Sequence, residues 1–145
     1  MISQVLLIAV AVIGGIAVAL QGQFMGLMDR QIGTLENVFL TFGVGGILAA
    51  LLLLAVRGGN IGQWQQLPWW TLSSGLLGVV IIAAIGFSVS RLGTLAAFTL
   101  IVAMQFVTAA LIDHFGLFGA EVRPIDISKL SGMGILILGV WLTVR

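Results

Sequence analysis

The chain has 145 residues, of which 60% are hydrophobic and only 8% are charged, and its mean hydropathy is +1.23. Soluble domains carry about 25% charged residues, so this composition excludes a water-soluble protein and predicts an integral membrane protein. The formal net charge of +1 provides no basic surface for nucleic acid. Because the chain has no cysteine and a single histidine, we expect no disulfide, no metal site and no other cofactor.

Uncharged apolar runs predict five transmembrane helices, and therefore an all-α membrane bundle in contact with the lipid bilayer. We place these helices at about 3–21, 37–56, 69–90, 93–113 and 130–144, within a single transmembrane domain that covers 1–145. No basic segment precedes the first helix, so we expect it to be retained rather than removed as a signal peptide.

Polar residues follow the first predicted helix. Gln21 and Gln23 flank a glycine near its end, which fits either a water-facing mouth of a binding site or an ordinary helix end at the membrane surface. Asp29 and Arg30 begin a polar break, and we expect both to lie in a solvated turn.

The third predicted helix is preceded by tryptophans and carries small residues on one face. Trp64, Trp69 and Trp70 are typical of an aromatic belt at the membrane–water boundary, although a cation-binding aromatic box is an alternative. The short polar segment 91–93 predicts an antiparallel hairpin with the fourth helix. Helical spacing places on one face the residues Gly75, Gly78, Ile82 and Gly86.

The fourth predicted helix carries a single amide near its middle, Gln105, and Thr108 shares its face. A buried amide can bind a polar solute without the cost of a buried charge, but it can equally form an interhelical hydrogen bond. Asp113 and His114 end this helix. They could act as a gate or proton acceptor, or they could simply form a polar helix end.

The basic residues predict no preferred orientation in the membrane. If all five helices cross, the loops and ends divide Lys and Arg equally between the two sides, with Arg57, Arg123 and Lys129 on one and Arg30, Arg91 and Arg145 on the other. The sequence therefore favours insertion in both orientations and an antiparallel homodimer, with a small-molecule site near the bilayer midplane. We expect the segment 116–129 to be a solvated loop.

Several short segments, taken in order, resemble the YdcZ-like five-helix branch of the drug/metabolite transporter superfamily. They include the glutamines Gln21 and Gln105 and the segments 69–71, 75–78, 92–94, 111–116 and 139–142. Export of metabolites and toxic compounds is the typical activity of that superfamily. For this branch, the resemblance implies a multi-pass transporter of the inner (plasma) membrane and specifies no cargo. Larger members of the superfamily are similar to two such units joined head to tail in opposite orientations.

One feature departs from the four-helix multidrug members of that superfamily, which carry a glutamate in the middle of the first helix. Here the segment 9–20 has no carboxylate, which puts the familiar proton-coupled antiport in doubt. No set of residues suits nucleophilic catalysis, so we expect no enzyme and no catalytic residues.

We therefore predict a transporter of a small polar or cationic metabolite that works by alternating access, with Gln105, Gln21, Gln23 and Thr108 as substrate-binding residues. The alternative is a non-transporting membrane partner that packs on another integral membrane protein and regulates it, with its glycine faces as the contacts.

Overall fold

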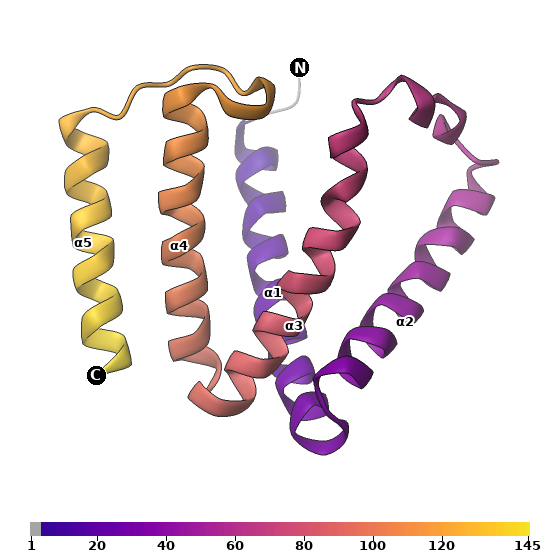
Figure 1. Ribbon diagram of the computed structural model, residues 1–145, viewed down its shortest axis with the longest axis horizontal. Coiled ribbons are helices and arrows are strands. Elements are labelled where there is room, and N and C mark those ends of the chain that lie inside the picture. The colour runs from indigo at the N-terminus through magenta and orange to yellow at the C-terminus, as the bar shows by residue number, and fades with distance from the viewer. Residues whose placement is uncertain (1–3) are drawn as a thin grey trace. The chain divides into compact units, whose positions relative to one another are not determined.

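The computed structural model describes residues 4–145, and these form an all-α structure, as predicted (Figure 1). Its helices are α1 (Gln4–Ile32), α2 (Thr34–Ala55), α3 (Ser74–Leu92), α4 (Thr94–Phe115) and α5 (Ile127–Val144), with 3-10 turns η1 (Ile61–Gln66), η2 (Trp69–Ser73) and η3 (Leu117–Gly119). Within this range, five segments are long and apolar enough to cross a membrane, with η2 and α3 together forming the third. The chain divides into two compact units: unit 1 ends at Arg91, and unit 2 comprises Leu92–Arg145.

Unit 1 contains α1, α2 and α3, and α1 packs against α2. The two helices are separated by a single residue, Gly33, whose φ of 102° is readily reached only by glycine. The Gly33 amide closes α1 by donating to Asp29 O at 3.1 Å, and its carbonyl oxygen accepts from the Asn37 amide at 3.1 Å to start α2.

The first helix was predicted to end near residue 21, with an end at Met28 as the alternative, and both are too early, because α1 continues to Ile32. Its 29 residues extend over about 43 Å, more than the roughly 30 Å of a bilayer core. The polar residues Asp29 and Arg30 lie inside the helix because their side chains find partners in unit 1. The predicted start at Ser3 lies outside the described residues.

Unit 2 is an antiparallel pair in which α4 packs against α5 (Figure 1). Gly116, with a φ of 61°, ends α4 and donates its amide to Ile112 O. Asp126 starts α5, since its carboxylate accepts the Lys129 amide at 2.7 Å. This cap places the start of α5 at Ile127, before the predicted position 130.

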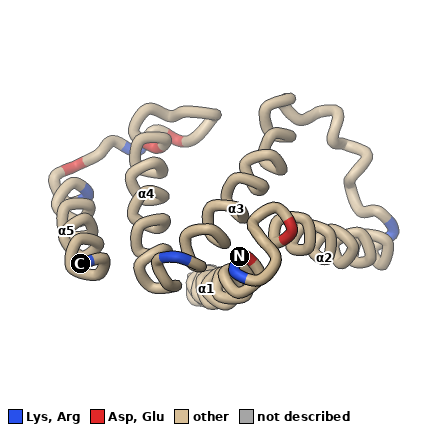
Figure 2. The backbone as a smooth tube through the Cα atoms, turned by 60° about the horizontal axis from the view of Figure 1, so that its bottom comes forward, with Lys and Arg blue, Asp and Glu red and all other residues tan. Residues whose placement is uncertain are grey.

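The surfaces of the helices suit a lipid environment. Most large apolar side chains of the described residues are exposed, and the buried apolar ones are few: Met25, Ile85, Val89, Ala97 and Ala103. Figure 2 shows the charged positions gathered at helix ends and in the connections between helices. This pattern is expected where lipid rather than water covers the helix surfaces.

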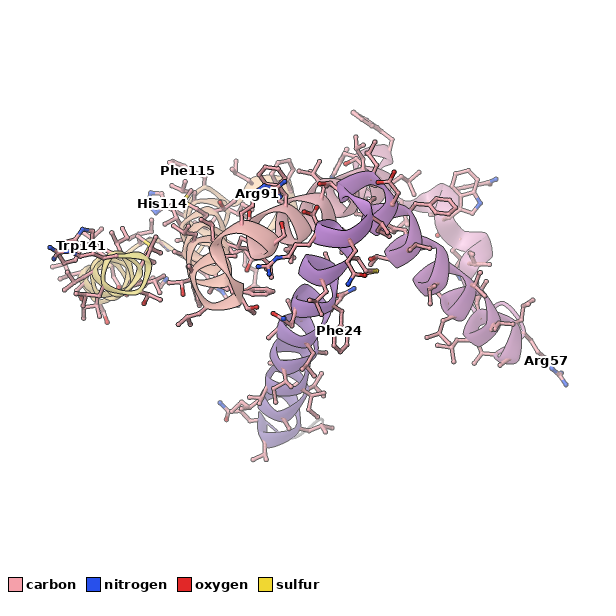
Figure 3. All side chains as sticks on the ribbon, turned by 90° about the horizontal axis from the view of Figure 1, so that it is seen from below. Phe24, Arg57, Arg91, His114, Phe115 and Trp141 are labelled. Carbon is pink, nitrogen blue, oxygen red and sulfur yellow. The ribbon has the colours of Figure 1, made fainter. Side chains whose placement is uncertain are left out.

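The connection between α2 and α3 carries the tryptophans. Trp64, Trp69 and Trp70 are all at least partly exposed. The rings of Trp69 and Trp70 meet edge to face, with centroids 6.2 Å apart, so they do not form two parallel walls around a cation. Arg57 projects away from the end of α2 (Figure 3).

Candidate functional site

The middle of α4 presents two polar side chains on one side. Gln105 and Thr108 are exposed, and both line a shallow groove of about 390 Å³ together with Leu100, Ile101 and Met104. The prediction that Gln105 and Thr108 share a face is therefore confirmed. From the ends of α4 at Thr94 and Phe115, Gln105 is about 15 Å away along the axis, so it lies at mid-helix.

The other two candidate amides lie on α1, in unit 1. Gln21 and Gln23 are both exposed, and Gly22 between them is buried. Residues two apart on a helix do not face each other, so these amides point to different sides of α1. Because α1 continues to Ile32, Gln21 does not lie at a helix end. It lies about 12 Å from Asp29 along the helix axis, toward the middle of α1.

Asp113 and His114 occupy the last turn of α4 but have different surroundings. The backbone amide of Ile125 donates to His114 Nδ1 at 3.0 Å, so the imidazole anchors the segment that returns toward α5. The imidazole packs edge to face on Phe115, with centroids 4.7 Å apart. An Nδ1 that accepts a hydrogen bond belongs to the neutral tautomer protonated at Nε2.

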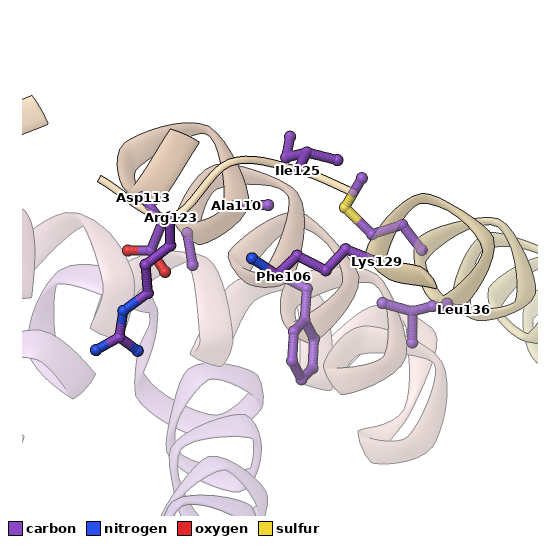
Figure 4. Close-up of a pocket in the computed structure, with 10 residues that line it drawn as sticks. Phe106, Ala110, Asp113, Arg123, Ile125, Lys129 and Leu136 are labelled. Atoms are coloured by element: carbon purple, nitrogen blue, oxygen red, sulfur yellow. The ribbon is translucent and has the colours of Figure 1, made fainter. Parts of the chain in front are cut away.

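Asp113 instead faces a cavity of about 540 Å³ inside unit 2 (Figure 4). Helix α4 contributes one wall, α5 another, and the segment 123–125 covers one side. The lining is mostly apolar and contains three charged residues: Asp113, Arg123 and Lys129. The sequence predicted Arg123 and Lys129 as part of a solvated loop, and it gave no signal that they share a cavity with Asp113.

The returning segment is held against the end of α4 by backbone and side-chain bonds. The Arg123 amide donates to Asp113 O at 2.8 Å. Its guanidinium pairs with Glu121 at 2.9 Å on the solvent side. The hydrogen bond to Glu121, with the charges of Glu121 and Asp113, raises the pKa of Arg123 above its usual value, so this side chain stays cationic.

A polar network at one end of unit 1 was not predicted. Asp29 is buried, and its carboxylate accepts hydrogen bonds from Thr34 Oγ1 at 2.6 Å, Ser90 Oγ at 2.7 Å and Arg91 Nη1 at 3.0 Å. Arg30 Nε donates to Ser90 O at 2.7 Å and so satisfies a carbonyl group in the last turn of α3.

The prediction that Asp29 lies in a solvated turn is therefore wrong. A signal was present, since Gly22, Gly26 and Asp29 follow the helical spacing of one face, and all three are buried. The Arg91 guanidinium that pairs with Asp29 also forms a cation–π contact with Phe87, 3.5 Å from the ring centroid.

Asn37 is the other buried polar residue of the described chain. Its Oδ1 accepts a hydrogen bond from Thr41 at 3.3 Å, and its Nδ2 has no partner among the described residues. The amide lies directly against Gly86 of α3, where a Cβ would collide with it. Asn37 thus marks the place where α2 meets α3.

Within residues 4–145, no group of three or more His, Cys, Asp or Glu side chains could hold a metal ion.

Comparison with known proteins agrees with the five-helix architecture. The chain is 25% identical over 146 residues to the inner membrane protein YdcZ of Escherichia coli (strain K12), an alignment that covers 99% of this chain and 97% of that protein. No solved structure matches the chain.

A family model described as "Putative inner membrane exporter, YdcZ" matches residues 6–142. This match, the five membrane-spanning helices and the full-length likeness to an inner membrane protein place the chain in the inner membrane as a multi-pass protein. The chain belongs to the YdcZ family of the drug/metabolite transporter superfamily.

Proposed function

We propose that this protein exports a small polar or cationic metabolite by alternating access, working as an inverted pair of identical chains. The family description supports export across the inner membrane. The pairing and the nature of the cargo are inferred from the residues of the chain.

The observation that carries the proposal is the exposure of Gln105 and Thr108 in the middle of α4. A polar group that faces acyl chains without a partner costs several kcal/mol, roughly as much as a lost hydrogen bond or more. The exposed Gln21 on α1 faces the same difficulty. These side chains therefore need protein, water or cargo beside them, and a second chain would supply the missing wall.

The distribution of charge favours an inverted second chain. With three basic residues expected on each side, neither orientation is preferred. In an inverted pair, only residues at mid-depth lie at the same level in both chains. Gln105 meets this condition, and a two-fold axis in the membrane plane would bring both copies of Gln105 to the same depth.

The chemistry of the site suggests the class of cargo. An amide offers two donors and an acceptor without a charge, which suits a neutral or zwitterionic solute. Asp113 at the end of α4 adds a negative charge that would attract a cation toward the mouth of the site. Asp29 is not offered to cargo, because three side chains already bind its carboxylate.

Transport by purified protein in lipid vesicles tests the proposal. The tracer is the compound that most raises Tm in a screen of cations, amino acids and sugars. Gln105→Leu should reduce its flux at least about tenfold while Tm stays close to that of the wild type, because only the polar group is lost. Gln63→Leu, in the exposed turn η1, is the matched control and should leave flux unchanged. Wild-type flux in Gln105→Leu would remove this residue from the site.

A second candidate function has one observation in its favour. A Cβ built on several glycines of α1 and α2 would meet no neighbouring atom within 4 Å; these are Gly14, Gly15, Gly43, Gly45 and Gly46. Such faces allow close approach of another helix, which could belong to an unrelated membrane protein. Obligate co-purification with one unrelated subunit, together with no flux in vesicles, would favour a regulatory partner over a transporter.

A further inference from the structure

The cavity inside unit 2 carries an inference that goes beyond transport. It lies between α4, α5 and the segment 123–125, and it has a volume of about 540 Å³, within the range of small-molecule sites. All of its lining residues come from unit 2 of a single chain, so the cavity needs neither unit 1 nor a second copy to form. Those residues are Phe106, Ala109, Ala110, Asp113, Arg123, Ile125, Lys129, Gly132, Met133 and Leu136.

Asp113 is the negative group of this cavity, and its charge interacts with that of Arg123, but its carboxylate accepts no hydrogen bond from the described residues. The side chain is half-buried, and within residues 4–145 no hydrogen bond reaches the carboxylate, although the backbone oxygen accepts the Arg123 amide. It also lies in the last turn of α4, where the helix dipole disfavours a negative charge. A cationic ligand with N–H donors would supply the missing hydrogen bonds and would offset the unfavourable interaction of the carboxylate with the helix dipole.

Arg123 and Lys129 are the positive groups, and both keep donors to spare. Arg123 uses Nη2 for Glu121, and Lys129 uses one Nζ hydrogen for Pro124 O at 2.9 Å. An arginine has five N–H donors and a lysine has three, so an anion beside them can still receive hydrogen bonds from both.

The remainder of the lining is apolar and runs along both helices away from the charges. Phe106 lies about 10 Å along α4 from Asp113, and Leu136 lies about 10 Å along α5 from Lys129. Met133 lies between those levels on α5. Figure 4 shows Asp113 and Arg123 close together on one side of the cavity, with Leu136 on the opposite wall. A ligand that fills this space needs an ammonium, an anion and an apolar body.

We propose that this cavity binds a phospholipid whose headgroup joins a primary ammonium to a phosphate, the chemistry of phosphatidylethanolamine. The ammonium donates to Asp113, and the phosphate receives hydrogen bonds from Arg123 and Lys129. An acyl chain lies between α4 and α5 against Phe106, Met133 and Leu136. The apolar lining favours a lipid over a free zwitterion such as an amino acid, which has no chain long enough to cover it.

The test measures binding of three short-chain lipids to the full-length purified protein: dihexanoyl phosphatidylethanolamine, phosphatidylcholine and phosphatidylglycerol. Native mass spectrometry and the rise in Tm are the readouts. We expect the wild type to bind phosphatidylethanolamine at least about tenfold more tightly than the other two, since phosphatidylcholine has no N–H donor and phosphatidylglycerol has no cation.

Two pairs of variants assign the preference to the cavity. Asp113→Asn should remove the preference for phosphatidylethanolamine, whereas Glu36→Gln, which neutralises an exposed carboxylate in unit 1, should keep it. Lys129→Gln should weaken binding of phosphatidylethanolamine and phosphatidylglycerol, and Arg57→Gln should not. Equal binding of the three lipids by the wild type, or an undiminished preference in Asp113→Asn, would overturn the proposal.

Two further measurements decide the question if Asp113→Asn does not fold or if the cavity binds a free solute instead of a lipid. Ala109→Leu fills the cavity without changing a charge, so it decides the question if Asp113→Asn does not fold, and an undiminished preference in it would also overturn the proposal. Leucine serves as a free zwitterion. If leucine raises Tm through Asp113 and phosphatidylethanolamine does not, the cavity is a solute site and the lipid assignment is wrong.

Discussion

Asp29 and Asn37 are the two buried polar residues of the described chain, and their surroundings differ. The Asp29 carboxylate is compensated by two hydroxyl groups and a guanidinium, whereas the Asn37 Nδ2 has no partner within residues 4–145. Burying a charge is costly unless it is paired and hydrogen-bonded, so the three donors explain how a charged residue can lie inside α1.

Asp29→Ala tests this explanation. The substitution removes the acceptor of Thr34 and breaks the ion pair with Arg91, while Ser90 and Arg91 keep the Phe87 carbonyl oxygen as an acceptor. We expect the free energy of unfolding in detergent to fall by about 3 kcal/mol. Glu36→Ala, at an exposed position on α2, serves as the control and should have little effect. A change of the same small size in both variants would show that the network does not stabilise unit 1.

Single residues also show which positions can be predicted from sequence patterns alone. Gln105 and Thr108 were placed correctly on one face because helical spacing alone determines that relation. Asp29 was misplaced because its burial depends on Ser90 and Arg91, which lie about sixty positions later in the chain. The cavity at Asp113 was missed for a similar reason, since Arg123 comes from the segment that follows α4 and Lys129 from the first turn of α5.

At the scale of elements, small residues determine how closely helices approach. The predicted small face of α3 meets α2 at two points: a Cβ on Gly78 would lie 3.0 Å from Phe42, and one on Gly86 would collide with the Asn37 amide. A Cβ on Gly26 of α1 would lie 2.5 Å from Val89 Cγ1. Backbone approach of this kind is the usual function of glycine between membrane helices.

Gly86→Ala should therefore destabilise unit 1. We expect a loss of about 1 to 3 kcal/mol in the free energy of unfolding, because the new methyl group must displace Asn37. Gly75→Ala, at an open position near the start of α3, is the control and should be neutral or slightly stabilising. Adding Asn37→Ala should recover part of the loss, so that the double variant costs less than the sum of the two single variants. Strictly additive losses would contradict the contact.

The segment after α4 depends on His114. Because Ile125 donates its amide to His114 Nδ1, His114→Ala should free this segment, and the Ile125 amide should exchange its hydrogen at least about tenfold faster. The Leu67 amide, which donates to Trp64 O, provides an internal reference in the same experiment. Unchanged exchange at Ile125 would show that the imidazole does not anchor this segment.

Helix ends were harder to predict than helices. The five apolar runs were sufficient to identify five spans, because few other structures can satisfy the backbone in lipid. The ends depend on single residues: Gly33 alone separates α1 from α2, and Asp126 alone starts α5 by capping it. Polar residues near Asp29 suggested an earlier end, but burial and hydrogen bonds keep that turn helical.

At the scale of the whole molecule, the proposed function depends on how the chain is oriented in the membrane. The charges lie at helix ends, and the expected division gives three basic residues to each side. Gln21 on α1 and Gln105 on α4 are exposed at mid-helix, where lipid offers no hydrogen-bond partner. An inverted pair accounts for both features, since it needs insertion in two orientations and places mid-depth residues of both chains at one level.

The most direct measurement uses the absence of cysteine from the chain. A single cysteine added after Arg145 is labelled with a membrane-impermeant maleimide, first in intact cells and then after permeabilisation. If the chain inserts in both orientations with no preference, about half of the protein should react in intact cells. A variant with three additional lysines at one end of the bundle is the control, and it should react almost completely or hardly at all. Labelling of the unmodified chain from one side only would contradict the inverted pair.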